Sequence, residues 1–247
     1  MPRYKILIEY DGTNYCGWQK QPESDTVEEQ IEAALAQILR KPVDIIGQGR
    51  TDSGVHAEGQ VAHFDFSEVL DEDKLLYALL GVLPSDISVW DMQEVASDFH
   101  ARFDAIARRY RYQIAVRPAP LWRNTSEMVL NKLNLEAMTT CAQKIKGTHN
   151  FDSFTKSNND NPDSTCTVEI SEFSHQGPLL LYHIEANRFV HHMVRRLVGT
   201  MIQVGKGKRT VAEFSDLITA PSKKKNGFGA AAKGLILEKV IYKKVRN

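Results

Sequence analysis

Long apolar runs, paired cysteines and a net charge are all missing from this sequence. No stretch approaches the ~20 apolar residues of a membrane-spanning helix, and the opening residues enter a strand-like pattern, not a signal peptide. Cys16, Cys141 and Cys166 form neither a C-x-x-C pair nor a zinc-type spacing. With 42% hydrophobic and 25% charged residues, the composition is typical of a globular protein. We therefore expect a cytoplasmic protein with reduced cysteines.

The charges balance over the whole chain but are distributed unevenly along it. Residues 1–100 hold 7 Lys+Arg and 19 Asp+Glu, whereas residues 101–247 hold 24 and 12. Clustered Lys and Arg bind polyanions because they displace counterions from phosphates. The second part is therefore where we expect a polyanion to bind, although charge alone is equally compatible with an ordinary solvated surface.

The spacing of apolar residues predicts one order of elements twice. The predicted strands are 4–10, 43–46, 61–66, 87–95, 109–116, 165–174, 179–186 and 235–242. The predicted helices are 27–39, 73–80, 135–146, 189–204 and 211–220, the first with a capping box of Thr26 and Glu29. Both halves follow the β-α-β-β-α-β order of ferredoxin-like units. We predict an α+β fold of two such lobes, 1–105 and 106–247, forming a mostly antiparallel sheet with helices on one face and a central active-site cleft.

The segment 47–59 is unusually rich in glycine for a connection between two strands. It reads GQGRTDSGVHAEG, and such density allows a ligand or another backbone to approach closely. Asp52 would lie at the tip of this loop, either as a functional carboxylate or as a turn residue bonded to its own backbone. The segment lacks the third glycine of a dinucleotide fingerprint, and Gly205-Lys206 lacks the hydroxyl and glycine spacing of a phosphate loop. We therefore expect no nucleotide cofactor.

Two further stretches carry charge where a core pattern would be apolar. Arg195 lies in the predicted helix 189–204 among apolar residues, so it either pairs with a buried anion or belongs to a solvated face. The run 108–112 reads RRYRY, which alternates basic and aromatic side chains on opposite faces of a strand. Guanidinium groups contact phosphates and exposed rings stack on unpaired bases, although ordinary sheet packing remains an alternative for Tyr110 and Tyr112.

These features together resemble a known family. The run 49–57, GRTDSGVHA, is similar to the active-site motif of TruA-type tRNA pseudouridine synthases. Further matches occur in the family's order: YDGTNYCGWQ at 10–19, FHARF at 99–103, ARRYRY at 107–112, FVHHMVR at 189–195 and GLIL at 234–237. The chain departs from the pattern at Val168, where an Arg is expected, and this puts one RNA contact in doubt.

The resemblance implies an isomerase that converts uridine to pseudouridine at positions 38, 39 and 40 of the tRNA anticodon stem-loop. It implies that Asp52 is the catalytic carboxylate, that Tyr110 stacks on the target uracil, and that Arg195 supplies the cation that keeps the carboxylate ionised. It also implies a homodimer that needs no cofactor and no metal. The substrate-binding residues that we predict are Arg50, Arg102, Arg108, Arg109 and Arg111, with lysines 206, 208 and 223–225 and Arg209 as outer phosphate contacts.

Two other classes of function compete with this isomerase. The first is a catalytically idle RNA-binding protein on the same scaffold, and the second is a hydrolase that uses Asp52 and histidines. Adjacent helical residues point about 100° apart, so His191 and His192 do not make a metal pair, and no H-E-x-x-H motif accompanies them. We set aside the segment 226–230, NGFGA, as a flexible link.

Overall fold

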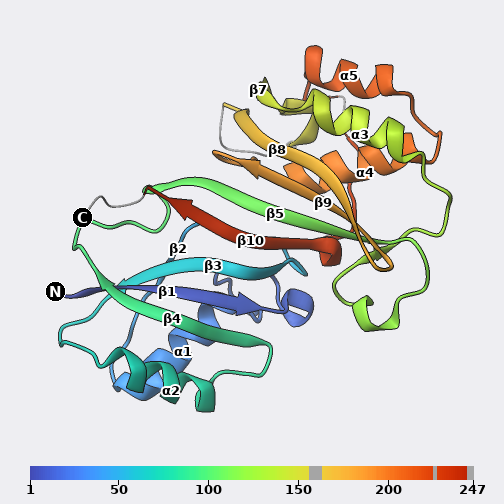
Figure 1. Ribbon diagram of the computed structural model, residues 1–247. Coiled ribbons are helices and arrows are strands. Elements are labelled where there is room, and N and C mark those ends of the chain that lie inside the picture. The colour runs from blue at the N-terminus through green and yellow to red at the C-terminus, as the bar shows by residue number, and fades with distance from the viewer. Residues whose placement is uncertain (156–162, 225–226, 244–247) are drawn as a thin grey trace. The chain divides into compact units, whose positions relative to one another are not determined.

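The computed structural model describes residues 1–155, 163–224 and 227–243, which form two compact units (Figure 1). The first unit is Met1–Ile106 together with the chain from Leu237 onward, and the second is Ala107–Ile236. The α-helices are α1 Val27–Leu39, α2 Glu72–Val82, α3 Leu135–Lys144, α4 Met193–Gly205 and α5 Val211–Thr219. The strands are β1 Arg3–Tyr10, β2 Ile46–Gly47, β3 His56–Asp65, β4 Ile87–Val95, β5 Ala105–Ala115, β6 Glu127–Met128, β7 Gly147–Asn150, β8 Thr165–Gln176, β9 Leu179–Ala186 and β10 Leu235–Tyr242.

The first unit has the strand pairing of a ferredoxin-like unit. Strand β1 pairs antiparallel with both β3 and β4, and the short β2 pairs antiparallel with β3. Because alternate residues of a strand face opposite sides, β1 buries Tyr4, Ile6, Ile8 and Tyr10 on one face. Helices α1 and α2 lie on the same side of this sheet in Figure 1. This layered core supports the loops that follow β1 and precede β3.

The last strand divides the chain differently from the predicted lobes. Strand β10 begins in the second unit, but from Leu237 it belongs to the first, where β3 is its neighbour in the sheet. A Cβ atom on Gly59 of β3 would lie 2.5 Å from the carbonyl oxygen of Glu238, so the two backbones approach closely there. The last strand of the predicted lobe 106–247 therefore belongs, from Leu237, to the first unit.

The second unit repeats the arrangement with its own strands. Strand β9 pairs antiparallel with β5 and β8, and β7 pairs antiparallel with β8. The two-residue β6 pairs parallel with β5 and is an exception to the antiparallel pattern. Tyr112 and Tyr182 lie opposite each other on β5 and β9 and are fully buried. The α+β class with mostly antiparallel strands is thus confirmed.

The predicted helix boundaries agree with the structure to within two residues except at the start of α4. Helix α4 begins at Met193, not at residue 189, so His191 precedes the helix. The capping box predicted at Thr26 does not form, because Thr26 is the N-cap residue of α1 but its side chain makes no capping hydrogen bond. The carbonyls of Gly17 and Trp18 accept the N–H groups of Val27 and Glu28. A capping box occurs instead at the start of α5, between Thr210 and Glu213.

Two observations concern features that the composition raised. Among the described residues, no helix is long and apolar enough to cross a bilayer. All three cysteines are free, and Cys141 and Cys166 are buried whereas Cys16 is exposed. The interpretation as packing residues therefore applies to two of the three.

Candidate functional site

Asp52 lies in a turn that is fixed from both sides. The N–H of Val55 donates to the carbonyl of Asp52 at 3.1 Å, and Gly54 has a φ of +73°, which glycine adopts without strain. The Ser53 hydroxyl and the Gly54 N–H both donate to the carbonyl of Tyr15, at 3.2 and 3.3 Å. The loop after β1 therefore holds the turn that carries Asp52.

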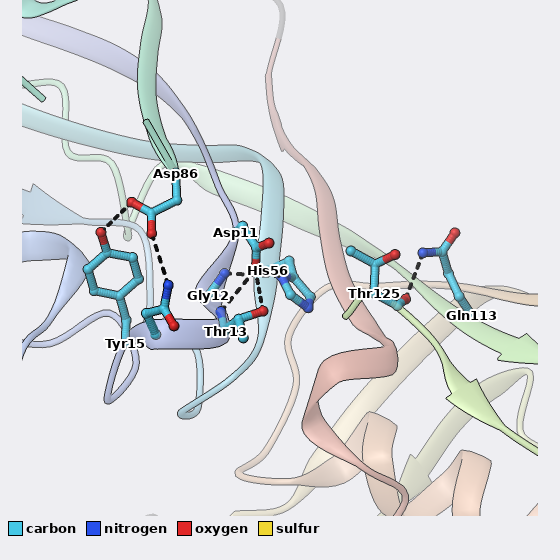
Figure 2. A network of polar contacts seen from close by, with 9 residues as sticks. Asp11, Gly12, Thr13, Tyr15, His56, Asp86, Gln113 and Thr125 are labelled. Carbon is cyan, nitrogen blue, oxygen red and sulfur yellow. Dashed lines mark hydrogen bonds and ion pairs between the residues drawn. The ribbon is translucent and has the colours of Figure 1, made fainter. Parts of the chain in front are cut away.

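The residue before Asp52 is anchored in the same way. The hydroxyls of Thr51 and Tyr10 are 2.8 Å apart and buried, and the Trp18 N–H donates to the Thr51 carbonyl at 3.2 Å. Tyr15 donates its hydroxyl to Asp86 at 2.5 Å, which ties the same loop to the start of β4 (Figure 2). Residues of the 10–19 motif thus hold the 49–57 motif in place, because the two segments are in contact in the folded chain.

His56 fixes the loop from the start of β3. Its Nδ1 accepts the Gly12 N–H at 3.0 Å and lies 3.0 Å from Asp11 Oδ1 (Figure 2). The same nitrogen cannot make both hydrogen bonds at once. It accepts the Gly12 N–H only without a proton, and it donates to Asp11 only with one. Burial raises the pKa of Asp11, but hydrogen bonds from the Thr13 N–H and hydroxyl outweigh this effect and leave it below its usual value.

Arg50 is exposed and is held by a side chain of the 10–19 motif. Its Nε donates to the Gln19 Oε1 at 2.9 Å. Gln19 in turn donates its Nε2 to Glu28 at 2.8 Å, and Glu28 is only 6% exposed on α1. Burial raises the pKa of the Glu28 carboxyl above its usual value. Neither the apolar stripe of α1 nor the glycine-rich motif around Asp52 connects these three residues, because the contacts join segments distant in the sequence.

In the second unit, Tyr110 packs against a residue of another predicted motif. Tyr110 lies on β5 opposite Ile184 of β9, and its ring meets that of Phe189 edge to face at a centroid distance of 5.1 Å. Phe189 opens the FVHHMVR motif that leads into α4. The two motifs therefore meet through an aromatic pair, and Tyr110 is held in a defined orientation while remaining partly exposed.

The arginines of β5 are not equivalent. Arg109 forms an ion pair with Glu185 directly across on β9, with Nε and Nη2 at 2.7 and 2.6 Å from the same oxygen. Arg108, on the face of Tyr110, donates to the Asn187 carbonyl at 3.0 Å. Arg111 lies opposite His183. A guanidinium paired with a carboxylate attracts a phosphate less than the same guanidinium without that partner, so the pairing with Glu185 weakens Arg109 as a candidate phosphate contact.

Arg195 is held by a backbone segment that had been set aside as a flexible link. Its Nε donates to the Ala230 carbonyl at 3.0 Å, and the Ala230 N–H donates back to the Arg195 carbonyl at 2.9 Å. One turn further along α4, a Cβ on Gly199 would lie 2.2 Å from the Phe228 carbonyl oxygen. Residues 227–230 therefore pack directly on α4, and the interpretation of this segment as a flexible link is wrong for its described part.

The next residue after this segment, Ala231, is anchored by a half-buried carboxylate. Glu127 of β6 accepts the Ala231 N–H at 2.9 Å and the Tyr112 hydroxyl at 2.5 Å. Burial, and then the Glu127 carboxylate, raise the pKa of Tyr112 well above its usual value, while the charge of Arg195 opposes the shift. Tyr112 therefore packs in the core of the sheet, which decides between its two interpretations. The nearby Gln113 side chain donates to the Thr125 carbonyl at 2.7 Å (Figure 2).

The remaining predicted RNA contacts are divided between the two units. Arg102 is exposed in the first unit, with its guanidinium carbon 5.7 Å from the Phe103 ring centroid. Lys225 lies outside the described residues, whereas Lys206 and Lys208 follow α4 on the second unit. Val168 is 2% exposed between Gly147 and Ala186, so this position contributes an apolar side chain to the core.

An α+β scaffold that presents a carboxylate on a rigid turn, with basic and aromatic side chains on a strand, is typical of an enzyme acting on nucleic acid. The chain matches the family model described as tRNA pseudouridine synthase over residues 6–104 and 141–243. It is 40% identical to tRNA pseudouridine synthase A of Acetivibrio thermocellus, over 98% of this chain and 100% of that protein. It is 38% identical to the protein of the same name from Exiguobacterium sp., over 99% and 100% of the two chains.

A third relative, tRNA pseudouridine synthase A of Bacteroides thetaiotaomicron, is 40% identical over 98% of this chain and 91% of its own length. The chain therefore belongs to the tRNA pseudouridine synthase family. This membership confirms the resemblance seen in the motifs and the class of enzyme predicted from it, an isomerase acting on uridine in tRNA.

Proposed function

We propose that this protein converts uridine to pseudouridine at positions 38, 39 and 40 of the tRNA anticodon stem-loop, with Asp52 as the catalytic carboxylate. The observation that carries the assignment of Asp52 is its place in a turn clamped through Thr51, Ser53 and Gly54. Hydrogen bonds of the residues on both sides of Asp52 hold the backbone of this turn in place. A carboxylate presented in this way keeps its geometry while a substrate binds and leaves.

The reaction requires only groups that the chain and its substrate contain. The bond between the ribose C1′ and uracil N1 breaks, the detached uracil turns, and C1′ forms a bond with C5. The C5 proton leaves and N1 gains a proton, so that the product is an isomer of the substrate. Asp52 supports the breaking of the glycosidic bond as a nucleophile or anion-stabilising group, and Tyr110 stacks on the uracil and accepts the C5 proton.

A uridine in a stem must leave its helix before a carboxylate reaches it. Unstacking and unpairing cost a few kcal/mol, which contacts to the RNA backbone must offset. We propose that Arg50, Arg102, Arg108 and Arg111 make such contacts and that Arg195 stabilises the ionised carboxylate. Arg109 is a further candidate, and its pairing with Glu185 reduces what it offers to a phosphate. A homodimeric assembly and a cytoplasmic location belong to the same proposal.

Tritium release from tRNA labelled at uridine C5 tests this function directly, because the C5 hydrogen is lost only if C5 forms the new bond. Wild-type protein without added metal or cofactor should release tritium, and Asp52→Asn should release it at least ~10³-fold more slowly while binding tRNA within a few fold. Asp44→Asn is the matched control, because Asp44 is an exposed carboxylate of the same unit. Base-resolution mapping of pseudouridine at positions 38–40 tests the site of modification.

The outcomes separate the competing functions. Release by wild type and by Asp52→Asn at similar rates would remove Asp52 from the mechanism. Tight binding of unmodified tRNA with no release by any variant would identify an RNA-binding protein without this activity. Activity that disappears with a chelator and yields free uracil would instead support the hydrolase.

A further inference from the structure

A chain of three side chains connects helix α1 to the loop that carries Asp52. Arg50, two residues before Asp52, donates its Nε to Gln19 Oε1 at 2.9 Å. Gln19 donates its Nε2 to Glu28 Oε2 at 2.8 Å, and the same oxygen accepts the Lys20 N–H at 2.8 Å. All of these contacts lie within the first unit. The proposed chemistry uses neither Gln19 nor Glu28, yet Glu28 is a carboxylate that is almost fully buried.

The direction of these hydrogen bonds is fixed by the chemistry of Glu28. An ionised carboxylate only accepts hydrogen bonds, so Gln19 must turn its NH₂ group toward Glu28. The amide oxygen then faces Arg50, whose guanidinium only donates. The reversed amide would place two donors against each other and leave a buried carboxylate oxygen with one bond fewer, which is costly. Glu28 therefore determines which atom of Gln19 meets Arg50.

The guanidinium of Arg50 keeps its outer donors for another partner. Only its Nε is engaged by Gln19, and within the described ranges the two terminal nitrogens have no hydrogen bond or ion pair. The side chain is exposed. Two terminal N–H groups in a fixed plane fit the oxygens of a phosphate, and a held guanidinium loses less conformational entropy on binding than a mobile one.

We propose that Gln19 is a positioning residue for Arg50, and that Glu28 sets the orientation of the Gln19 amide, so that Arg50 presents its terminal N–H groups to a phosphate of the bound RNA. The inference rests on the proposed function, because the phosphate is that of the tRNA substrate. A purely structural role would have Glu28 and Gln19 hold only the backbone of residues 17–20. The two roles differ in whether the loss of Gln19 acts through Arg50.

A double-mutant cycle with steady-state kinetics on tRNA tests this inference. Gln19→Met removes both hydrogen bonds at similar side-chain length, and Arg50→Met removes the guanidinium. We expect each to raise KM about 5- to 10-fold with kcat changed less than about 2-fold. The double variant should be no worse than Arg50→Met alone. The slope of log KM against log salt should fall by about 0.7 to 0.9 in all three variants, as for the loss of one phosphate contact.

Matched variants separate positioning from general loop damage. Glu28→Gln keeps the side-chain size but removes the charge that orients the Gln19 amide, so its salt slope should fall between those of wild type and Gln19→Met. Glu32→Gln is the control, because Glu32 lies one turn further along α1 and bonds Ile45 and Lys20 but neither Gln19 nor Arg50. Its salt slope should equal that of wild type. Thermal unfolding of every variant reports whether the fold is kept.

Three results would overturn the inference. These are additive effects of Gln19→Met and Arg50→Met, an unchanged salt slope in Gln19→Met, or a salt slope in Glu28→Gln equal to that of wild type. Unfolding of Gln19→Met would have the same meaning, because it would assign Gln19 to the fold instead of to Arg50. Absence of tritium release from the wild-type protein would instead refute the proposed function.

Discussion

The two units hold their predicted catalytic residues by different means. In the first, Asp52 is fixed mainly by neutral hydrogen bonds among Tyr10, Tyr15, Trp18 and the turn itself. In the second, the side chains around Tyr110 and Arg195 are held through ion pairs, an aromatic pair and a carboxylate-anchored backbone segment. Both units contain a close backbone approach, at Gly12 and at Gly199, and the second adds an ion pair on the strand that carries Tyr110.

This difference predicts different sensitivities to mutation. A close backbone approach leaves no room for an added atom, so a single methyl group has a large effect. A charged network responds instead to the loss of a partner, and partial exposure reduces the cost because water solvates the charge that remains. Four experiments test this comparison, beginning with the largest expected effect.

Gly12→Ala should be the most damaging of these substitutions. The added Cβ would lie 2.0 Å from the Val55 carbonyl oxygen, which follows Asp52 in its turn, and neither backbone can move independently. We expect a loss of about 3 kcal/mol or more in the free energy of unfolding. Urea denaturation measures it, and Gly49→Ala is the control for stability, because a Cβ there meets nothing within 4 Å. Equal stability of the two variants would refute the importance of the close approach.

Gly199→Ala tests the backbone contact of the second unit. Replacing glycine by alanine inside a helix ordinarily stabilises by roughly 0.5–1 kcal/mol. Here the Cβ would lie 2.2 Å from the Phe228 carbonyl and displace the segment that holds Arg195, so we expect a loss of about 2 kcal/mol instead. We also expect kcat to fall at least 10-fold. Gly229→Ala on the same segment, where a Cβ meets nothing within 4 Å, should not lower stability.

A pH titration probes a buried histidine in the first unit. Burial, aided by the charges of Arg3 and His100, lowers the pKa of His63 to about 4, and its Nδ1 accepts the Ala101 N–H. In the unfolded chain His63 binds a proton near pH 6.5, whereas in the folded chain it does so only near pH 4. The neutral His63 therefore contributes its full stability above pH 6.5, and this contribution is lost as pH falls toward 4. We expect a loss of about 2 kcal/mol over this range. His63→Gln cannot titrate and should flatten this part of the stability profile; an unchanged profile would contradict the assignment.

One ion pair in each unit allows a direct comparison of coupling energies, and these are the smallest of the four expected effects. Arg109–Glu185 in the second unit and Arg3–Asp65 in the first both have contacts of 2.7 Å or less. The carboxylate side chain is 14% exposed in the former and 41% in the latter. Double-mutant cycles to alanine should give coupling energies of about 1 kcal/mol and about 0.5 kcal/mol, respectively. A larger coupling for Arg3–Asp65 would contradict the dependence on burial.

The amino-acid sequence by itself determined the elements and the motifs. Periodic apolar positions gave the order of strands and helices, since a helix and a strand bury residues at different spacings. The range 235–242 for the last strand agrees with the structure. The motif around Asp52 and the family match also followed from the order of residues alone. These features are local, so they can be recognised without knowing which segments meet.

Only the tertiary structure decided which distant residues support the site. Gln19 meets Arg50 and Glu28, and Ala230 meets Arg195, across separations that no periodicity encodes. Thr26 is the N-cap residue of α1, yet its side chain makes no capping bond, and the carbonyls of Gly17 and Trp18 accept the first two N–H groups of the helix. Hydrogen-bond partners depend on which groups the fold brings within about 3 Å, and that proximity is a property of the packed chain.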